Sequence, residues 1–496
     1  MIKLPLLLLI NLSQCSGIYP QILKMTKIIP VAKVGKDPAL ASSFRPVSNL
    51  SVVGKLIERA VFNQIDKHIT DHKLTDKDQH GGRKSHSTMS CSTEIIEDIK
   101  KAQEGKYQVA LVALDLSAAY DMVDHGILLE RCRLLNLCQT TQNFLRSFLA
   151  TRSSLVELEG TRSSLRATGN HGVVQGGPSS GTLFNIYIND LPAQVNDLQP
   201  TSSLGCSSAK QYVDNGTIVA RGKTLQQLKM NIRRDYIAMR NYLVNHRMVI
   251  NGGKTQLMIM KPHADPDDLD LDIDGMLICH QTSIKILGVT ISEELKFDEH
   301  VWKGKGSITR SVVYKSSLLR TLKPYLPFPL LCQVGNAILN STIQYCAPLW
   351  GPSSESNRIK VQAAQVRAAR IITGEWNSEK VRSHRQDLLS KIKWPNVNQI
   401  IEIATLNLLK NAIERKASEG LTGLFWVTKP TVNARRNTLR IDHFGPLTRS
   451  NSFFSANAVH LFNNLPLHMK NPSLSRGNFK KLVKENALEN NLLTRH

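Results

Sequence analysis

A run of six apolar residues that ends at an aspartate is the feature that most constrains the fold of this chain. Residues 109–114 read VALVAL, and Asp115 follows them directly. A strand with no polar residue on either face must be covered on both sides, so this run predicts a central strand of a sheet. The carboxylate of Asp115 would then emerge at the C-terminal edge of that strand, where a site can form.

A second acid lies in a predicted hairpin further along the chain. Residues 211–220 read QYVDNGTIVA, which predicts strands at 208–213 and 216–220 with Asp214 at the turn. The dipeptide Asn215-Gly216 favours a type I′ turn, because both residues tolerate positive φ. An isolated Asp-Asn-Gly is most often only a turn, so the rest of the sequence has to decide whether Asp214 has a function.

If the two strands are neighbours, Asp115 and Asp214 meet at one edge of the sheet. Mg²⁺ binds one or two carboxylates together with substrate phosphates and waters. Two such ions can activate a 3′-hydroxyl and stabilise a leaving pyrophosphate. The pair of acids therefore predicts a two-metal nucleotidyl transferase.

The charge of the chain points to a polyanionic partner. The formal net charge is +23 over 496 residues, and most of it is concentrated in residues 301–496, where 29 Lys and Arg face 10 Asp and Glu. So strong a basic excess favours nucleic acid first and an anionic membrane second. We expect the C-terminal third to follow a phosphate backbone, whereas the alternative is a basic surface that serves solubility.

The N-terminus and the cysteines bear on the compartment. Residues 1–17 read MIKLPLLLLINLSQCSG, which imitates a secretory signal but is too short to span a membrane. The eight cysteines include no C-x-x-C pair, which argues against a zinc ribbon and for reduced thiols. We interpret residues 1–17 as an apolar helix of an intracellular protein, in the cytoplasm and nucleus, without a membrane partner. A secreted protein is the alternative, which a native disulfide would support.

The order of predicted elements indicates an α+β fold. Residues 52–69 carry apolar residues at helical spacing, 172–175 read as a short strand, and Asn251-Gly252-Gly253 between 248–250 and 257–260 predicts a hairpin. Residues 284–291 predict one further strand. Beyond about residue 300 the pattern is almost wholly helical and basic, which indicates a helical region appended to an α+β core.

Seven motifs stand in a fixed order along the chain. They are SSFRPVSNLSVVGKLIE (42–58), QHGGRKSHST (79–88), VALVALDLSAAYDMVDH (109–125), GVVQGGPSSGTLFNIYINDLP (172–192), QYVDNGTIVA (211–220), MVINGGKTQLMIM (248–260) and IKILGVTISEELKFDEH (284–300). In this order they resemble the reverse transcriptase of a Jockey-like non-LTR (LINE-type) retrotransposon. The resemblance covers nearly the whole chain. The endonuclease that such elements carry upstream is absent from the sequence, so we expect a partial copy.

The resemblance implies roles for individual residues. Asp115 and Asp214 would hold two Mg²⁺ ions, with Mn²⁺ as an alternative. Tyr120 matches the aromatic gate that selects deoxynucleotides, although an aromatic ring packed under the strand would look the same. Asn215 stands where the family has a second acid; an amide keeps an oxygen for ligation but removes a negative charge beside a dication.

Further residues match positions that contact the nucleotide in the family. Arg83 and Lys84 resemble finger cations on the triphosphate of the dNTP; the alternative is a solvated charge pair. Gln175 and Gly176 resemble the motif that lies against the incoming base and the template. Lys254 matches a lysine near the leaving pyrophosphate, and a turn lysine is the alternative.

The same resemblance implies a right-hand polymerase. We expect fingers at 1–105, a palm with the remaining fingers elements at 106–295, a helical thumb at 296–400 and a basic C-terminal region at 401–496.

The expected function is RNA-directed DNA synthesis from a DNA 3′-hydroxyl, with an RNA template, a DNA primer and dNTPs as partners. The alternative is a catalytically degenerate, retroelement-derived nucleic-acid-binding protein. Because both bind RNA with strong salt dependence, activity must discriminate between them.

Overall fold

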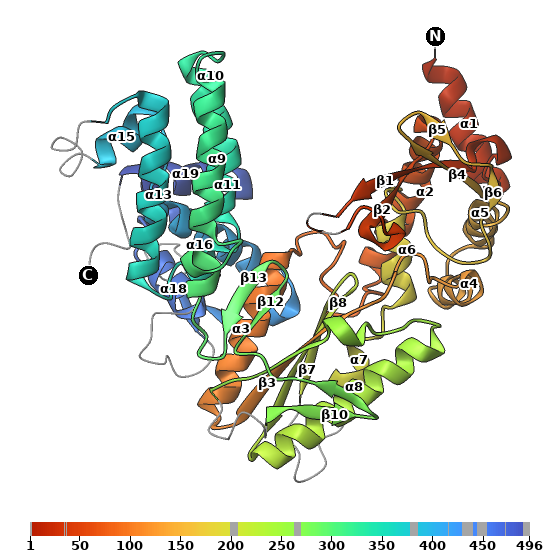
Figure 1. Cartoon of the computed structure of the whole chain (residues 1–496), viewed down its shortest axis with the longest axis horizontal. Coiled ribbons are helices and arrows are strands. Elements are labelled where there is room, and N and C mark those ends of the chain that lie inside the picture. Colours follow the sequence, from red (N-terminus) through yellow and green to blue (C-terminus); the bar gives the residue numbers. More distant parts are fainter. Residues whose placement is uncertain are drawn as a thin grey trace. The chain divides into compact units, whose positions relative to one another are not determined.

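The computed structural model describes most of the chain (Figure 1). The described residues are 2–33, 35, 37–198, 207–261, 269–376, 385–414, 416–428, 440–443, 454–471 and 473–489. The chain forms two compact units. The first unit comprises Met1–Gly82, Val112–Ala220 and Gln226–Thr255, and the second comprises Arg83–Leu111, Arg221–Leu225 and Gln256–His496. Both helices and sheets build the molecule, so the predicted α+β class is confirmed.

Helices surround the sheets of the first unit. They are α1 (Lys3–Ser16), α2 (Val52–Asp71), α4 (His125–Leu134), α5 (Gln139–Leu149), α6 (Ser180–Tyr187), α7 (Ala193–Asn196) and α8 (Leu225–Asn245). The apolar run at the N-terminus is helical, as predicted, and α1 ends at Gly17, which has a φ of 66°. Helix α2 confirms the predicted helix at 52–69 and is capped by the hydroxyl of Ser51.

Two sheets carry the first unit. One has the order β2-β1-β4-β5, with β6 also paired to β4; its strands are β1 (Met25–Ala32), β2 (Phe44–Asn49), β4 (Ser153–Leu158), β5 (Thr161–Arg162) and β6 (Arg166–Ala167). In the other, β7 (Ser208–Tyr212) is antiparallel to β8 (Asn215–Gly222), which neighbours β3 (Gln108–Asp115). Residues 109–112 of β3 are buried, which confirms the predicted central strand.

Several predicted elements in the first unit are wrong in detail. Residues 172–175 form no strand, because the amides of Gly172 and Val173 donate to the carbonyls of Val123 and Tyr120, each over 2.8 Å. Residues 248–260 form no hairpin. The amides of Lys254 and its neighbour instead turn back onto the carbonyl of Asn251, which gives the 3₁₀ turn η3 (Gly252–Lys254).

The second unit is mainly helical. Its helices are α3 (Thr88–Glu104), α9 (Ile308–Leu322), α10 (Phe328–Gly335), α11 (Ser341–Gln344), α12 (Ala347–Trp350), α13 (Glu355–Thr373), α15 (Arg385–Lys391), α16 (Val397–Ile413), α17 (Glu419–Thr422), α18 (Phe454–Asn463) and α19 (Arg476–Glu489). Helices α9 and α13 lie side by side (Figure 1). The predicted helical pattern beyond residue 300 is confirmed apart from the strand pair β14 (Phe425–Thr428) and β15 (Arg440–His443).

Short strands complete the second unit. They are β9 (Gln256–Ile259), β10 (Leu271–Ile273), β11 (Met276–Ile278), β12 (Ser283–Ile286) and β13 (Val289–Ser292). The single strand predicted at 284–291 is wrong, since β12 and β13 form a hairpin. Its turn residues Leu287 and Gly288 have φ values of 46° and 84°. Two consecutive positive φ angles are typical of a type I′ turn.

Two buried acids of α3 bind the C-terminal helices of the second unit. The carboxylate of Glu97 accepts from the amide of Ser455 over 3.0 Å and from its hydroxyl over 2.8 Å, at the beginning of α18. Glu94 accepts from the amide of Leu421 in α17 over 3.2 Å. Carboxylates suit helix N-termini, where amides lack partners. Helix α3 therefore shares a core with residues that follow it by more than 300 positions.

A buried histidine in the second unit makes stability depend on pH. His300 lies in the π-helical segment η5 (Glu299–Lys303) and is 7% exposed. Burial, together with the charge of Lys285, lowers the pKa of His300 from 6.5 to about 4. Between pH 6.5 and about pH 4 the imidazole of His300 is protonated in the unfolded chain but neutral in the folded chain. The contribution of His300 to the free energy of unfolding is therefore fully present above pH 6.5 and is lost as the pH falls.

We expect the protonation of His300 to lower the free energy of unfolding by about 2 kcal/mol between pH 7 and pH 5. Urea unfolding of the wild type and of His300→Phe at the two pH values measures the effect. The variant should lose this part of the pH dependence, whereas His72→Phe, at an exposed position, should retain it. If the free energy of unfolding changed by the same amount between pH 7 and pH 5 in His300→Phe and in the wild type, His300 would not be the group responsible.

Candidate active site

Asp115 ends β3 at the mouth of a pocket in the first unit. Its backbone is fixed by the antiparallel segment beside it: the amide of Asn251 donates to the carbonyl of Asp115 over 2.8 Å, and Leu116 bridges to Ile250. The side chain is 29% exposed. A buried strand thus delivers a carboxylate to solvent at its C-terminal end, as the sequence predicts.

Asp214 lies in the turn between β7 and β8. The two-residue turn consists of Val213 and Asp214, because Tyr212 pairs with Asn215. The predicted Asn215-Gly216 turn is therefore wrong by two positions, and Val213 takes the positive φ, of 56°. Burial raises the pKa of Asp214, and the negative charge of Asp115 raises it further.

Lys254 reaches the same place from η3. Its Nζ donates to Oδ2 of Asp115 over 2.8 Å, and its charge lowers the pKa of Asp214. The turn that positions Lys254 begins at Asn251, whose amide is bonded to the carbonyl of Asp115. The structure therefore brings together Asp115, Asp214 and Lys254, which the sequence places far apart.

Asn215 contacts Asp214 and not the pocket. Its Nδ2 donates to Oδ1 of Asp214 over 2.9 Å, and the side chain is exposed. This hydrogen bond lowers the pKa of Asp214, in opposition to burial. A second carboxylate at this position would repel Asp214, whereas the amide supports its charged form.

Tyr120 forms a wall of the pocket. Its ring stacks on Phe184 of α6 with the centroids 5.0 Å apart and an angle of 21° between the planes. Burial raises the pKa of Tyr120, and the charge of Asp214 raises it further. The stacking on a buried ring restricts the movement of Tyr120, so the wall is fixed.

The loop that precedes α6 forms another side of the pocket. The carbonyl of Gln175 accepts from the amide of Ser48 in β2 over 2.9 Å. Gly176 has a φ of 98°, and a Cβ there would lie 3.3 Å from the carbonyl oxygen of Ser48. Glycine is therefore required at this position both for its backbone angle and for the close approach of β2.

The acids, Lys254, Tyr120 and the loop before α6 line one cavity of about 750 Å³. The lining includes Asp115, Asp214, Lys254, Tyr120, Asp121, Gln175, Gly176, Lys33 and Arg45. Sequence reasoning missed Lys33 and Arg45, which follow β1 and lie in β2. Arg45 belongs to the quoted motif at 42–58, so the motif could have indicated it. Lys33 is found only from the pairing of β1 with β2, which brings the two cations to one side.

Arg83 and Lys84 belong to the second unit and precede α3. Lys84 is exposed, and Arg83 is half-buried. Their role as triphosphate ligands stays a prediction.

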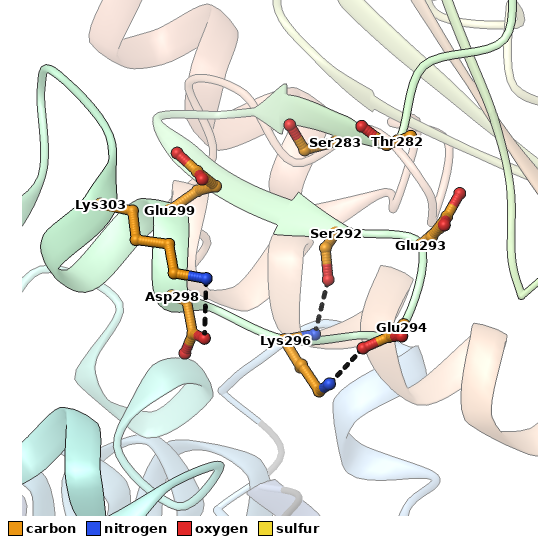
Figure 2. A pocket seen from close by; sticks show the side chains of 9 residues that line it. All are labelled: Thr282, Ser283, Ser292, Glu293, Glu294, Lys296, Asp298, Glu299 and Lys303. Atoms are coloured by element: carbon orange, nitrogen blue, oxygen red, sulfur yellow. Dashed lines mark hydrogen bonds and ion pairs between the residues drawn. The ribbon is translucent and has the colours of Figure 1, made fainter.

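A second pocket lies in the second unit around the β12–β13 hairpin (Figure 2). Its volume is about 280 Å³, and its wall carries four acids and two lysines. Lys296 pairs with Glu294, and Lys303 lies 3.6 Å from Asp298. Both lysines of this wall lie beside acids, whereas the larger pocket beside Asp115 also has Lys33 and Arg45 in its lining, so the pocket beside Asp115 is the better candidate for chemistry.

Residues 31–291 match the family described as reverse transcriptase (RNA-dependent DNA polymerase). The chain belongs to the reverse transcriptase family. The matched range contains Asp115, Asp214 and Lys254, and with them the pocket. The predicted resemblance to a polymerase of non-LTR elements is thereby confirmed at the level of the family, and the relatives agree with it.

Relatives of this chain come from mobile elements. The RNA-directed DNA polymerase from mobile element jockey of Drosophila melanogaster is 26% identical over 81% of this chain and 43% of its own length. Its counterpart from Drosophila funebris is 27% identical over 74% of this chain and 40% of its own length. The chain thus spans less than half of the length of either relative. Among solved structures, apo telomerase from Candida tropicalis has a TM-score of 0.42 and 14% identity, over 81% of this chain and 69% of that one.

The residues of the site fit a divalent cation, which the reverse transcriptase family generally uses. Asp214 is half-buried, and both burial and the negative charge of Asp115 raise its pKa, so a cation between the two acids would favour the charged form of Asp214. Lys254 supplies one such charge in this structure. The described residues contain no cluster of three or more His, Cys, Asp or Glu that could hold a metal. Two carboxylates suit Mg²⁺ when phosphates and waters complete its coordination.

Within the described ranges, no helix is long and apolar enough to cross a membrane.

Proposed function

We propose that this chain is an RNA-directed DNA polymerase that transfers a nucleotide from a dNTP to a DNA 3′-hydroxyl on an RNA template. The observation that carries the proposal is the convergence of Asp115, Asp214 and Lys254 in one pocket of a reverse transcriptase fold. The names of the jockey polymerases support the same reaction.

Each residue has a task in this reaction. Asp115 and Asp214 would hold Mg²⁺, which lowers the pKa of the attacking hydroxyl and neutralises charge on the phosphates. Lys254 lies within 2.8 Å of Asp115 and is free to turn to the leaving pyrophosphate once the acid has another cation. Gln175 and Gly176 offer a backbone wall for the base pair. Preorganised charges of this kind usually supply the largest part of catalysis.

Arg45 and Lys33 suit the triphosphate. Both line the cavity that contains the acids, and Lys33 is held by the carbonyl of Ser42 over 2.7 Å. The guanidinium of Arg45 is exposed on β2 and can make paired hydrogen bonds to phosphate oxygens.

Arg45→Ala is expected to raise the KM for dNTP about tenfold with little change in kcat, because the lost contact is the same in ground state and transition state. Steady-state extension kinetics measure both constants. Arg166→Ala, at an exposed position in β6, is the matched control and should leave KM unchanged. A fall in kcat without a rise in KM would contradict a binding role for Arg45.

Tyr120→Ala is expected to admit ribonucleotides. The ring is stacked on Phe184 and lines the pocket, so we expect it to lie beside the sugar of the bound nucleotide. Alanine removes that wall, so discrimination against the 2′-hydroxyl should fall by about tenfold or more. The ratio of kcat/KM for dNTP and rNTP measures it. Tyr120→Phe retains the ring and should retain the selectivity; equal selectivity in the alanine variant would refute the gate.

The proposal is tested by extension of a labelled DNA primer on an RNA template with Mg²⁺ and dNTPs. Products should lengthen with time and disappear when EDTA is added. Purified protein that binds the primer–template but never extends it would contradict the proposal.

A second function is favoured by one observation. The side chain of Asn215 is neutral and bonded to Asp214, so the site has one charge fewer than two adjacent acids would give. A protein that binds nucleic acid but has lost the chemistry would fit this. Activity separates the two, since RNA binding is common to both.

A further inference from the structure

A short segment runs beside the hairpin that carries Asp214. Gln79 and Gln211 of β7 form a parallel bridge. The amide of Gln211 donates to the carbonyl of Asp78 over 2.9 Å, and the amide of His80 donates to the carbonyl of Gln211 over 2.8 Å. We name residues 78–81 the 78–81 strut.

The strut is fixed at both ends. Nζ of Lys210 lies 2.5 Å from Oδ1 of Asp78, and both side chains are buried. Oδ2 of Asp78 accepts from the amide group of Asn196 over 2.6 Å. At the other end, Nδ2 of Asn185 donates to the carbonyl of Gly81 over 2.7 Å. A buried ion pair with further hydrogen bonds on the acid gives a defined register between the strut and β7.

The turn of the hairpin is strained where the strut touches it. Val213 has a φ of 56°, which is unfavourable for a β-branched residue. Oε1 of the buried Gln79 accepts from the amide of Val213 over 3.4 Å and from the amide of Gly81 over 2.9 Å. Nε2 of Gln211 donates to the carbonyl of Val213 over 2.5 Å. Two glutamines thus bind both backbone polar groups of Val213, its N–H and its carbonyl.

Gly81 allows this approach. A Cβ on Gly81 would lie 2.5 Å from the backbone nitrogen of Val213 and 2.5 Å from its Cγ2. No side chain fits there, so the backbone of the strut packs directly against the turn. Strain of this kind persists only where the surrounding structure imposes it.

We propose that Gln79 is a positioning residue: by holding Val213 in its left-handed conformation, it fixes the carboxylate of Asp214 toward the pocket. Gln79 touches no reacting atom and acts through the turn. The inference rests on the proposed function, because it explains how the polymerase site is kept in place. The strut itself can be tested without polymerisation.

The test compares Gln79→Met with Gln365→Met. Methionine keeps the length of glutamine but cannot accept from the two amides. Gln365 is as fully buried, at 0% exposure, and bonds to Asn340 and Pro395 in the second unit, so its variant controls for the loss of a buried amide. In metal-free protein, exchange of the Val213 amide should accelerate at least about tenfold in Gln79→Met alone. The Kd for Mn²⁺, measured by electron paramagnetic resonance, should rise about tenfold in the same variant.

Kinetics give a third readout. In Gln79→Met, kcat should fall while the KM for dNTP stays near the wild-type value, because Asp214 moves but Arg45 and Lys33 do not. Gly81→Ala should reproduce all three effects by pushing on Val213, and it carries the test if Gln79→Met does not fold.

The outcomes separate the two ideas. Faster exchange of the Val213 amide and weaker Mn²⁺ binding in Gln79→Met, in a protein that never extends a primer, would support the role of Gln79 and contradict the proposed polymerase activity. Wild-type amide exchange, Mn²⁺ affinity and DNA synthesis in Gln79→Met would overturn the positioning role of Gln79 and leave the proposed polymerase activity supported.

Discussion

Asp115→Ala is expected to abolish DNA synthesis while RNA affinity stays within about twofold of wild type. The loss should be at least about 10³-fold in kcat/KM, or about 4 kcal/mol of transition-state stabilisation. Asp115 lines the pocket from the end of β3, and alanine removes one of the two carboxylates proposed to hold the metal. We expect RNA affinity to come from the basic excess of residues 301–496, which the substitution leaves unchanged.

The control for this variant is Asp197→Ala, an exposed acid at the end of α7 in the same unit. Single-turnover extension and RNA binding at several salt concentrations are measured on all three proteins. A parallel loss of binding in Asp115→Ala would mean that the acid supports the fold and is not a ligand.

Asn215→Asp is expected to raise the rate of synthesis by about tenfold or more and to tighten binding of Mn²⁺ or Mg²⁺. The amide of Asn215 now donates to Asp214. A carboxylate removes that donor and adds a negative charge beside the two acids proposed to hold Mg²⁺. In metal-free protein the same change should raise the pKa of Asp214 further, because two like charges become adjacent.

Asn215→Ala separates the effect of losing the hydrogen bond to Asp214 from the effect of adding a negative charge. Alanine removes the hydrogen bond but adds no charge, so it should show no gain in rate or in metal affinity. Titration with Mn²⁺ and initial rates are compared for Asp, Asn and Ala at this position. An Asp variant no faster than the Ala variant would show that charge at position 215 does not limit the reaction.

The sequence predicted the parts of the site that follow from local pattern. The run at 109–114 has no polar residue, and such a run has few solutions other than a covered strand, so Asp115 was placed correctly. The hairpin at Asp214 was also placed, but its turn was assigned to the wrong dipeptide. The preference of Asn215-Gly216 for positive φ is real, yet Val213 takes that conformation because a distant segment, residues 78–81, packs against it.

Other parts of the site depend on contacts that no local pattern contains. Lys254 was predicted within a hairpin, and it reaches Asp115 only because the turn at Asn251 is bonded to the end of β3. Arg45 and Lys33 reach the pocket through pairing of β1 with β2. In each case a tertiary hydrogen bond decides the backbone path, and turn chemistry alone gives the wrong element.

We propose that this pocket adds deoxynucleotides to a DNA primer on an RNA template. The most direct measurement is single-turnover extension of one DNA primer on an RNA template with Mg²⁺, with wild type and Asn215→Asp assayed side by side. We predict synthesis by both proteins, faster with aspartate at 215. Failure of both to add a single nucleotide, while both bind the primer–template, would contradict the account.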